Sequence, residues 1–280
     1  MTVSDHSMTN GVGMAQELPN VMLPTPVPLQ PEGWVTGPPD FVGVGVMKAG
    51  TTWWWSLIAG HPDVAPPQLR SSEDLAEMYT VKERHFFAHY GQVEDIDPAV
   101  YHAHFPRPPG LITGEWTPSY QFHFWVPPML QRCAPKAKIL VILRDPLERF
   151  ISGLAHHALF GYEINNALLI NSLHRGFYWQ QLMNLLEYFD REQVLVLQYE
   201  RCCIDTVGQL RRTFEFLGID PGRWNGNYTA REHVGVSTKG HRLHFNEDTM
   251  RAVRCSYAAD TQRLLADFPE VDGALWRSAP

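Results

Sequence analysis

One stretch of the sequence, residues 41–55, limits the possible folds more than any other. It begins with an apolar run, residues 41–46, whose composition is typical of a buried parallel strand. A loop of lysine, glycine and threonine then leads into the apolar residues 53–59, which predict a helix. A strand that turns through such a loop into a helix directs backbone N–H groups and the positive end of the helix dipole at an anion. The stretch predicts a phosphate-binding loop in an α/β fold, with an ordinary strand–turn–helix as the alternative.

The residue types of the loop support anion binding. Gly50 allows the backbone to approach an anion closely, Lys48 supplies a point charge, and the hydroxyls of Thr51 and Thr52 can donate hydrogen bonds. A Walker A loop has four residues between two glycines and a lysine directly after the second glycine. Here Lys48 stands two residues before Gly50, so the loop is of another kind.

Composition and charge argue against some classes of binding partner. A net charge of −7 argues against nucleic acid or an anionic membrane, so an anionic ligand has to be met by local positive charge. The 4 cysteines lack the spacing of a metal site, and we expect free thiols in a reducing cytoplasm. No apolar run approaches the length of a membrane span and no signal peptide pattern is evident, so we expect a cytoplasmic protein.

The order of the predicted elements indicates the fold class. Residues 1–38 contain several prolines and predict a flexible tail, and residues 39–280 fit a single α/β domain. Buried strands alternate with helices along this domain; the clearest strands are residues 41–46, 138–143 and 193–199, and the clearest helices are residues 53–59, 122–133, 174–189, 206–217 and 247–268. This alternation predicts a central parallel sheet of four to five strands, covered by helices on both faces.

A second possible anion site follows the strand at residues 138–143. The strand runs directly into Arg144, and Asp145 with Pro146 has the pattern of a helix start. Arg149 and Ser152 are three residues apart and therefore lie on one face of that helix. An arginine at a strand end beside a helix hydroxyl can hold a phosphate; a structural Arg–Asp pair with a surface serine is the alternative.

Glu83 and His85 are the candidates for proton transfer. They are two residues apart, so in an extended segment they lie on the same face, next to the aromatic pair Phe86 and Phe87. A carboxylate and an imidazole in this arrangement can move a proton, although a surface cluster of charges gives the same pattern. The adjacent histidines His156 and His157 are expected to pack or to face water, and we predict no metal site.

The sequence resembles the sulfotransferases that use 3′-phosphoadenosine-5′-phosphosulfate (PAPS), and most of all their heparan sulfate sulfotransferase-like branch. Residues 48–53 resemble the family's 5′-phosphosulfate loop, and residues 144–152 match its 3′-phosphate motif, Arg-Asp-Pro-x-x-Arg-x-x-Ser. Residues 82–87 resemble the branch's Lys-Glu-x-His-Phe-Phe block, and residues 239–242 resemble its Lys-Gly-x-Arg loop. The resemblance covers roughly residues 40 to 277, with the four blocks in the family's order.

The resemblance implies a fold and a reaction. The fold is a three-layer sandwich similar to that of P-loop nucleotide hydrolases. The reaction is sulfuryl transfer from PAPS, with 3′-phosphoadenosine-5′-phosphate (PAP) as product, to a hydroxyl or, as second choice, an amine. The acceptor is a carbohydrate or a small molecule such as a natural product. No metal is required, because lysine and arginine supply the positive charge.

The resemblance also implies roles for particular residues. Lys48 contacts the bridging oxygen of the donor, and Glu83 is the general base, with His85 as the alternative base or as a residue that orients the acceptor. Arg144 and Ser152 hold the 3′-phosphate. The remaining donor-binding residues are Ala49, Gly50, Thr51, Thr52 and Trp53 in the loop and Lys239, Gly240 and Arg242 over the nucleotide.

Two departures from the family pattern affect the acceptor side. Glu115 is followed by Trp116 where the branch often has a lysine, and the segment between Pro66 and Lys82 is longer than expected. Without an anchor segment, the chain fits a soluble bacterial member. A P-loop-like nucleotide kinase or hydrolase and an inactive nucleotide-binding module remain the alternatives, and the sequence does not predict the oligomeric state.

Overall fold

A sheet of four parallel strands lies at the centre of the computed structural model, which describes residues 27–66, 82–89, 96–226, 243 and 245–279. The strand order is β4 (Gly114–Trp116), β2 (Phe41–Gly45), β5 (Lys138–Leu143) and β6 (Val194–Gln198). Nearly every residue of these strands is buried, as expected for a parallel sheet covered on both faces. The strands at residues 41–46, 138–143 and 193–199 were all predicted from the sequence.

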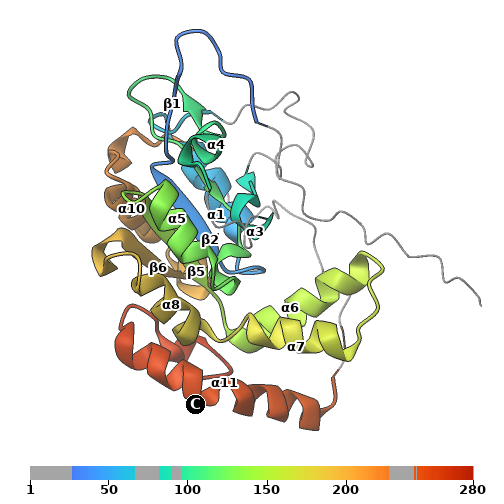
Figure 1. The fold of residues 1–280 in the computed structure, drawn as a ribbon. Coiled ribbons are helices and arrows are strands. Elements are labelled where there is room, and N and C mark those ends of the chain that lie inside the picture. The colour runs from blue at the N-terminus through green and yellow to red at the C-terminus, as the bar shows by residue number, and fades with distance from the viewer. Residues whose placement is uncertain (1–26, 67–81, 90–95, 227–242, 244, 280) are drawn as a thin grey trace, which may run out of the picture.

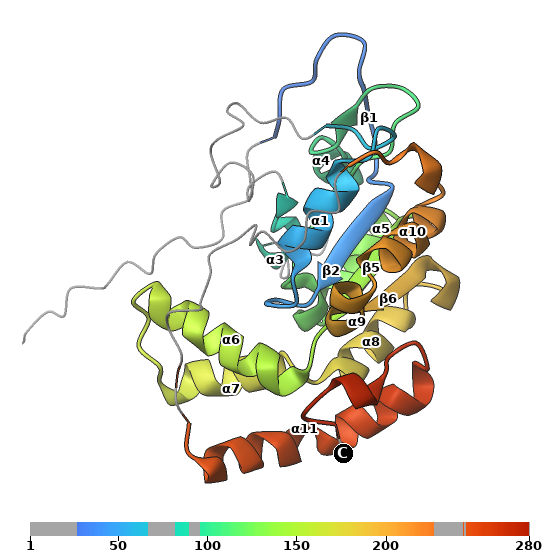
Figure 2. The same cartoon turned by 180° about the vertical axis from the view of Figure 1, so that it is seen from behind.

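Helices cover both faces of the sheet, as the views from opposite sides show (Figures 1 and 2). One face carries α5 (Val126–Cys133) and α8 (Tyr178–Leu186), and the other carries α1 (Thr51–Ala59), α9 (Tyr199–Ile204) and α10 (Thr206–Leu217). This is the three-layer α/β sandwich that the sequence predicts, and its core is one large apolar cluster between the layers.

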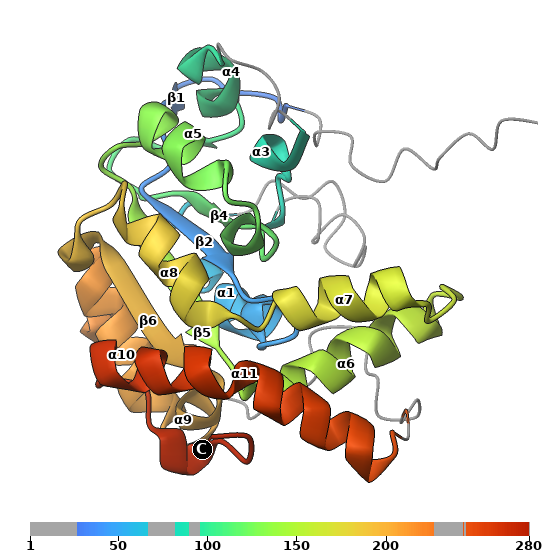
Figure 3. The same ribbon diagram turned by 60° about the horizontal axis from the view of Figure 1, so that its bottom comes forward.

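Three further helices pack together beyond the carboxyl end of the sheet (Figure 3). They are α6 (Pro146–Leu159), α7 (Asn166–His174) and α11 (Glu247–Asp267), and they share a second, smaller apolar cluster. The remaining described elements are β1 (Val35–Thr36), β3 (Pro106–Arg107), α3 (Phe86–His89), α4 (Pro98–His102) and 3₁₀ turns at residues 120–122, 191–193, 221–223 and 273–275.

The structure differs from the sequence predictions at several boundaries. Helix α7 was not predicted, because its apolar residues follow a glycine-containing loop without a clear stripe. Helix α5 begins only at Val126, since its two prolines occupy the first turn. Within the predicted tail, Val35–Thr36 pair antiparallel with Pro106–Arg107. The four cysteines are free thiols, as predicted, and no helix in the described part of the chain is long and apolar enough to cross a membrane.

Candidate active site

The loop between β2 and α1 has the geometry of an anion site. Gly50 precedes the helix with a φ of +82°, in the left-handed region. Among the described residues, no side chain caps the N–H groups of the first turn of α1. A Cβ at position 50 would lie 2.8 Å from the Tyr199 ring, so the loop needs glycine there for packing as well. Lys48 has a φ of +71°, which bends its backbone out of the strand direction.

Lys48 is held by contacts with two other elements. Its Nζ lies 3.3 Å from Nδ1 of His156 on α6. The guanidinium of Arg144, which follows β5, donates a hydrogen bond of 3.0 Å to the backbone oxygen of Lys48. Burial, with a smaller effect of the Arg144 cation, lowers the pKa of Lys48 from 10.5 to about 8. At neutral pH Lys48 is therefore still mostly an ammonium, and it is less costly to deprotonate than an exposed lysine.

Sequence reasoning missed the role of His156. We expected it to pack or to face water, whereas its ring contacts Lys48. Burial, followed by the Lys48 and His157 charges, lowers the pKa of His156 to about 4, so at neutral pH its imidazole is uncharged and can accept a hydrogen bond from the ammonium. The sequence did offer one indication of this role. His156 lies four residues after Ser152 and therefore shares its helix face.

Glu83 forms the centre of a charged cluster with its chain neighbours. Its Oε1 lies 2.6 Å from Nζ of Lys82, and its Oε2 lies 3.3 Å from Nε2 of His85. Burial acts to raise the pKa of Glu83, but the charges and hydrogen bonds of Lys82 and His85 outweigh it and hold the pKa below its usual value. Glu83 is therefore a carboxylate at neutral pH, which is the state a general base requires.

The cluster is joined directly to the loop between β2 and α1. The buried Lys82 ammonium also lies 3.3 Å from the hydroxyl of Thr51, the first residue of α1. Lys82 was part of the sequence motif but had no predicted role. The structure thus brings Lys48, Glu83 and His85 into one region at the carboxyl end of β2, where ligands bind in open α/β sheets.

A buried carboxylate fixes the backbone of this segment. Glu115 is fully buried and accepts hydrogen bonds from four donors: the hydroxyls of Tyr101, Thr117 and Tyr120 and the backbone N–H of Arg84. The Thr117 hydroxyl in turn accepts from the backbone N–H of His85, whose φ is +51°. Its burial and its four hydrogen bonds give Glu115 a structural role. Burial raises its pKa.

Trp116, at the position where the related branch often has a lysine, is part of the core. It is fully buried, it lies against Gly43, and its indole N–H donates to the backbone oxygen of Gly45 at 3.2 Å. Tyr120 is likewise buried, whereas Phe124 is exposed. Trp116 and Tyr120 therefore belong to the core.

Arg144 and Ser152 lie on the α6 side of the loop. Asp145 caps α6 as predicted, accepting from the N–H groups of Leu147 and Glu148. Arg144 pairs with Glu148 at 3.6 Å rather than with Asp145, and its guanidinium lies over the Tyr199 ring. Ser152 is partly buried, one turn before His156 on the same face. Lys239, Gly240 and Arg242, the predicted residues over the nucleotide, lie outside the described residues.

These features define a class: a three-layer α/β protein with a glycine-containing loop that has the geometry of an anion site, and a lysine and a carboxylate at the carboxyl end of its parallel strands. A family comparison makes the class specific. Residues 38–229 match the family model described as "Sulfotransferase domain", and the chain belongs to that family.

Curated relatives place the chain near one branch of this family. It is 30% identical over 195 residues to mouse heparan sulfate glucosamine 3-O-sulfotransferase 6, covering 65% of this chain and 52% of the relative. It is 28% identical over 196 residues to human heparan sulfate glucosamine 3-O-sulfotransferase 3B1, covering 65% and 46%. The chain spans about half the length of the curated relatives it matches.

Solved structures support the fold. A sulfotransferase from Alicyclobacillus acidocaldarius superposes with a TM-score of 0.61 at 21% identity, over 85% of this chain and 98% of that one. A sulfotransferase from Mycobacterium avium gives 0.53 at 13% identity, over 84% and 77%. The predicted similarity to the PAPS-dependent sulfotransferases and the predicted fold class are both confirmed.

Proposed function

We propose that this protein transfers the sulfuryl group of PAPS to a hydroxyl, or as second choice to an amine, of a carbohydrate or small-molecule acceptor. The observation that carries the proposal is the contact between Lys82 and Thr51, which joins the Glu83 cluster to the start of α1. A candidate base is thereby held next to a loop suited to the donor's phosphosulfate. Catalysis then consists of positioning and charge stabilisation, as in phosphoryl transfer.

Each residue of the site has a proposed part in the reaction. Backbone N–H groups of residues 49–53 and the threonine hydroxyls bind the 5′-phosphosulfate, and Lys48 donates to the bridging oxygen as negative charge develops on the leaving phosphate. Arg144 and Ser152 bind the 3′-phosphate, and Lys239, Gly240 and Arg242 close over the nucleotide. Lysine and arginine supply the positive charge that this scheme needs.

Glu83 is the proposed general base. It takes the acceptor proton through the carboxylate edge that faces His85, and His85 either orients the acceptor or acts as the base itself. The ion pair with Lys82 fixes the rotamer of Glu83 and keeps it ionised. It also weakens the carboxylate as a base, so proton transfer is expected late, once the acceptor oxygen has become acidic by bonding to sulfur.

Calorimetric titration with PAP, with ADP as the control that lacks the 3′-phosphate, tests the donor assignment. We expect micromolar or tighter binding of PAP that weakens sharply for ADP. Arg144→Ala and Ser152→Ala should weaken PAP more than ADP. The serine variant is needed because Arg144 also supports the backbone of Lys48. Equal binding of PAP and ADP would point to a different nucleotide and a kinase- or hydrolase-like activity.

Glu83→Gln tests the base. Labelled PAPS, screened against hydroxylated carbohydrates and phenolic small molecules, identifies the acceptor. With that acceptor, the variant should lose about 10²- to 10⁴-fold in turnover while its affinity for PAP stays near that of the unaltered protein. Near-normal turnover would rule out Glu83 and leave His85 as the base. An absence of transfer to every acceptor, despite tight PAP binding, would favour an inactive binding module.

A further inference from the structure

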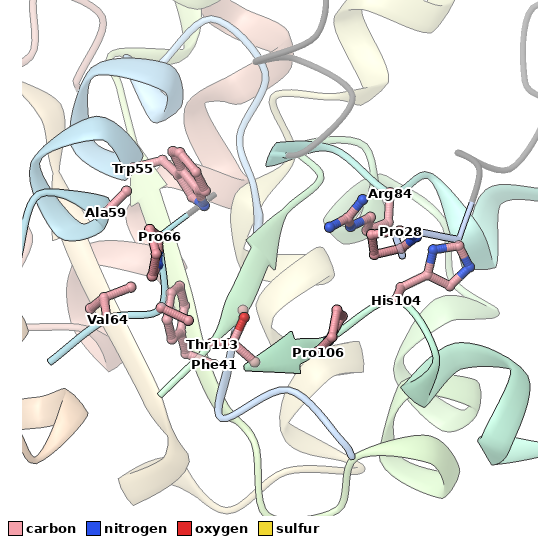
Figure 4. A pocket seen from close by; sticks show the side chains of 12 residues that line it. Pro28, Phe41, Trp55, Ala59, Val64, Pro66, Arg84, His104, Pro106 and Thr113 are labelled. Atoms are coloured by element: carbon pink, nitrogen blue, oxygen red, sulfur yellow. The ribbon is translucent and has the colours of Figure 1, made fainter. Parts of the chain in front are cut away.

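A pocket lies behind the segment that carries Glu83 and His85, away from the anion-binding loop. It opens between α1, the start of β2 and β4, and the chain around β3, and part of it is open to solvent. Figure 4 shows Trp55 of α1 on one side and Arg84 with His104 on the other. Most of the remaining lining is apolar and includes Phe41 and Val64.

Three polar groups of the pocket wall are buried without a partner. Arg84, His104 and Trp55 are each more than nine-tenths buried. Among the described residues, Nε of Arg84, Nδ1 of His104 and Nε1 of Trp55 have no hydrogen-bond partner. Buried polar groups in folded proteins are rarely left without partners, because each such group costs about 1–3 kcal/mol. Three of them around one cavity indicate an occupant that supplies acceptors.

Among the described residues, Glu115 is the carboxylate that attracts the Arg84 charge, and it cannot supply these acceptors. Its two oxygens already accept four hydrogen bonds, one of them from the backbone N–H of Arg84 itself. Four is about the number of lone-pair sites that a carboxylate offers. The guanidinium lies 6.0 Å from the centre of the Phe105 ring, and its Nε has no hydrogen-bond partner among the described residues. The Arg84 Nε–H is therefore an unsatisfied donor in the wall of the pocket.

We propose that this pocket binds the oxyanion head group of a small organic anion, a carboxylate or a sulfate ester, through Arg84, Trp55 and His104. A planar guanidinium matches the two oxygens of such a head group, and the indole N–H adds a neutral donor from the opposite wall. Burial and the Arg84 charge lower the pKa of His104 to about 4, so its imidazole is neutral and donates or accepts one hydrogen bond without adding charge. The apolar lining, which includes Phe41, Val64 and Pro106, suits a hydrocarbon or aromatic body.

The pocket is separate from the proposed donor site. Its residues Phe41 and Gly114 begin β2 and β4, whereas Lys48 follows the end of β2, and a five-residue strand spans about 16 Å. Arg84 nevertheless stands between Glu83 and His85 in the chain, and its backbone is fixed by Glu115. An anion that orders the Arg84 side chain therefore acts on the segment that carries the proposed base.

The test uses the full chain labelled with ¹⁵N at tryptophan, which gives one indole signal for each of its 9 tryptophans. Trp55→Phe identifies the Trp55 signal. The probes are benzoate, benzamide as its neutral counterpart, and inorganic sulfate as a head group without a body. We expect benzoate to move the Trp55 signal with a Kd on the order of 0.1–1 mM, and benzamide to leave it in place.

Variants then assign the effect to Arg84. Arg84→Met keeps the length of the side chain and removes the charge, and it should weaken benzoate binding at least tenfold. Arg201→Met, at a partly exposed ion pair with Asp272, changes the net charge equally and should leave binding unaltered. A shift by sulfate alone, also lost in Arg84→Met, would support the same site with a free inorganic anion as ligand.

Once Trp55→Phe has identified the Trp55 signal, the outcomes that overturn the proposal need only the unaltered chain. If neither benzoate nor sulfate at 10 mM, a ceiling about tenfold above the expected Kd, moves the Trp55 signal, the pocket is not an anion site. If benzamide binds as well as benzoate, the pocket binds apolar groups without regard to charge. The Arg84 guanidinium then interacts only with Glu115. Should Arg84→Met fail to fold, the comparison of benzoate with benzamide on the unaltered chain still decides the question.

Discussion

At the scale of single residues, Lys48 links the shape of the loop to its charge. Its positive φ directs it out of β2, and burial lowers its pKa to about 8. Its charge therefore changes within the pH range of ordinary binding measurements. An anion at the loop favours the ammonium form. Binding of PAP should therefore depend on pH in the range in which free Lys48 titrates.

Titration of PAP between pH 6.5 and 9.5 measures this dependence. The affinity is fully present below pH 8, where Lys48 is protonated, and is lost above it by up to about tenfold per pH unit, until the higher pKa of the bound form is reached. Lys48→Arg keeps its charge over the whole range and should give a flat profile. A wild-type profile as flat as that of the arginine variant would show that Lys48 does not contact the bound phosphate.

His156 is the second residue whose role depends on a contact. Its neutral imidazole accepts from Lys48, whose ammonium has two further N–H donors available for a ligand. His156→Leu should weaken PAP binding about 3- to 10-fold, because Lys48 then has to be ordered on binding. His156→Gln restores an acceptor and should recover most of the loss. Equal losses in both variants would assign His156 to packing alone.

The site shows what a sequence does and does not convey at this scale. Lys48, Glu83 and His85 were predicted because motifs carry them in short stretches of chain. The contacts of His156 with Lys48 and of Lys82 with Thr51 were not predicted, since they join residues 108 and 31 positions apart. Spacing along a helix indicates a shared face, but it does not indicate which element faces it.

At the scale of elements, too, the sequence predicts features that lie in short stretches of chain and misses those that depend on tertiary contacts. The central strands and helix α10 were predicted nearly to the residue, because buried strands are short apolar runs and α10 has a clear stripe and a terminal glycine. Helix α7 was missed, since it packs through a second cluster formed with α6 and α11, and only the tertiary structure brings these together.

The contact between β2 and β4 gives a prediction at this scale. A Cβ at Gly43 would lie 2.0 Å from the Trp116 ring, and the two residues are partners in the register of β2 and β4. Gly43→Ala should lower the free energy of unfolding by about 1–3 kcal/mol, measured by urea denaturation. Trp116→Leu in the same chain removes the clash, so the double variant should lose less than the two single variants together. Strict additivity would show that the two residues do not share this space.

At the scale of the whole molecule, buried histidines make stability depend on pH. The pKa values of His104 and His123 are about 4 in the folded protein, with burial as the main cause, against 6.5 for an unperturbed histidine. The unfolded chain therefore binds more protons than the folded one between pH 4 and 6.5, and the free energy of unfolding falls as the pH falls through this range. Above pH 6.5 this stability is fully present.

The contribution of His104 to this pH dependence of stability can be measured separately from that of the other groups. The difference between pKa values of 6.5 and about 4 corresponds to at most about 3 kcal/mol, of which about 2 kcal/mol is lost on going from pH 7.5 to 5.0. Glu115 acts in the opposite direction, since its raised pKa adds stability on acidification, so the total change has mixed origins.

We therefore compare changes: urea denaturation at both pH values should show the wild-type chain losing about 2 kcal/mol more than His104→Gln. The variant's lower absolute stability does not enter this difference. If both chains lose the same amount, His104 is solvated in the folded protein and its pKa is not lowered by burial.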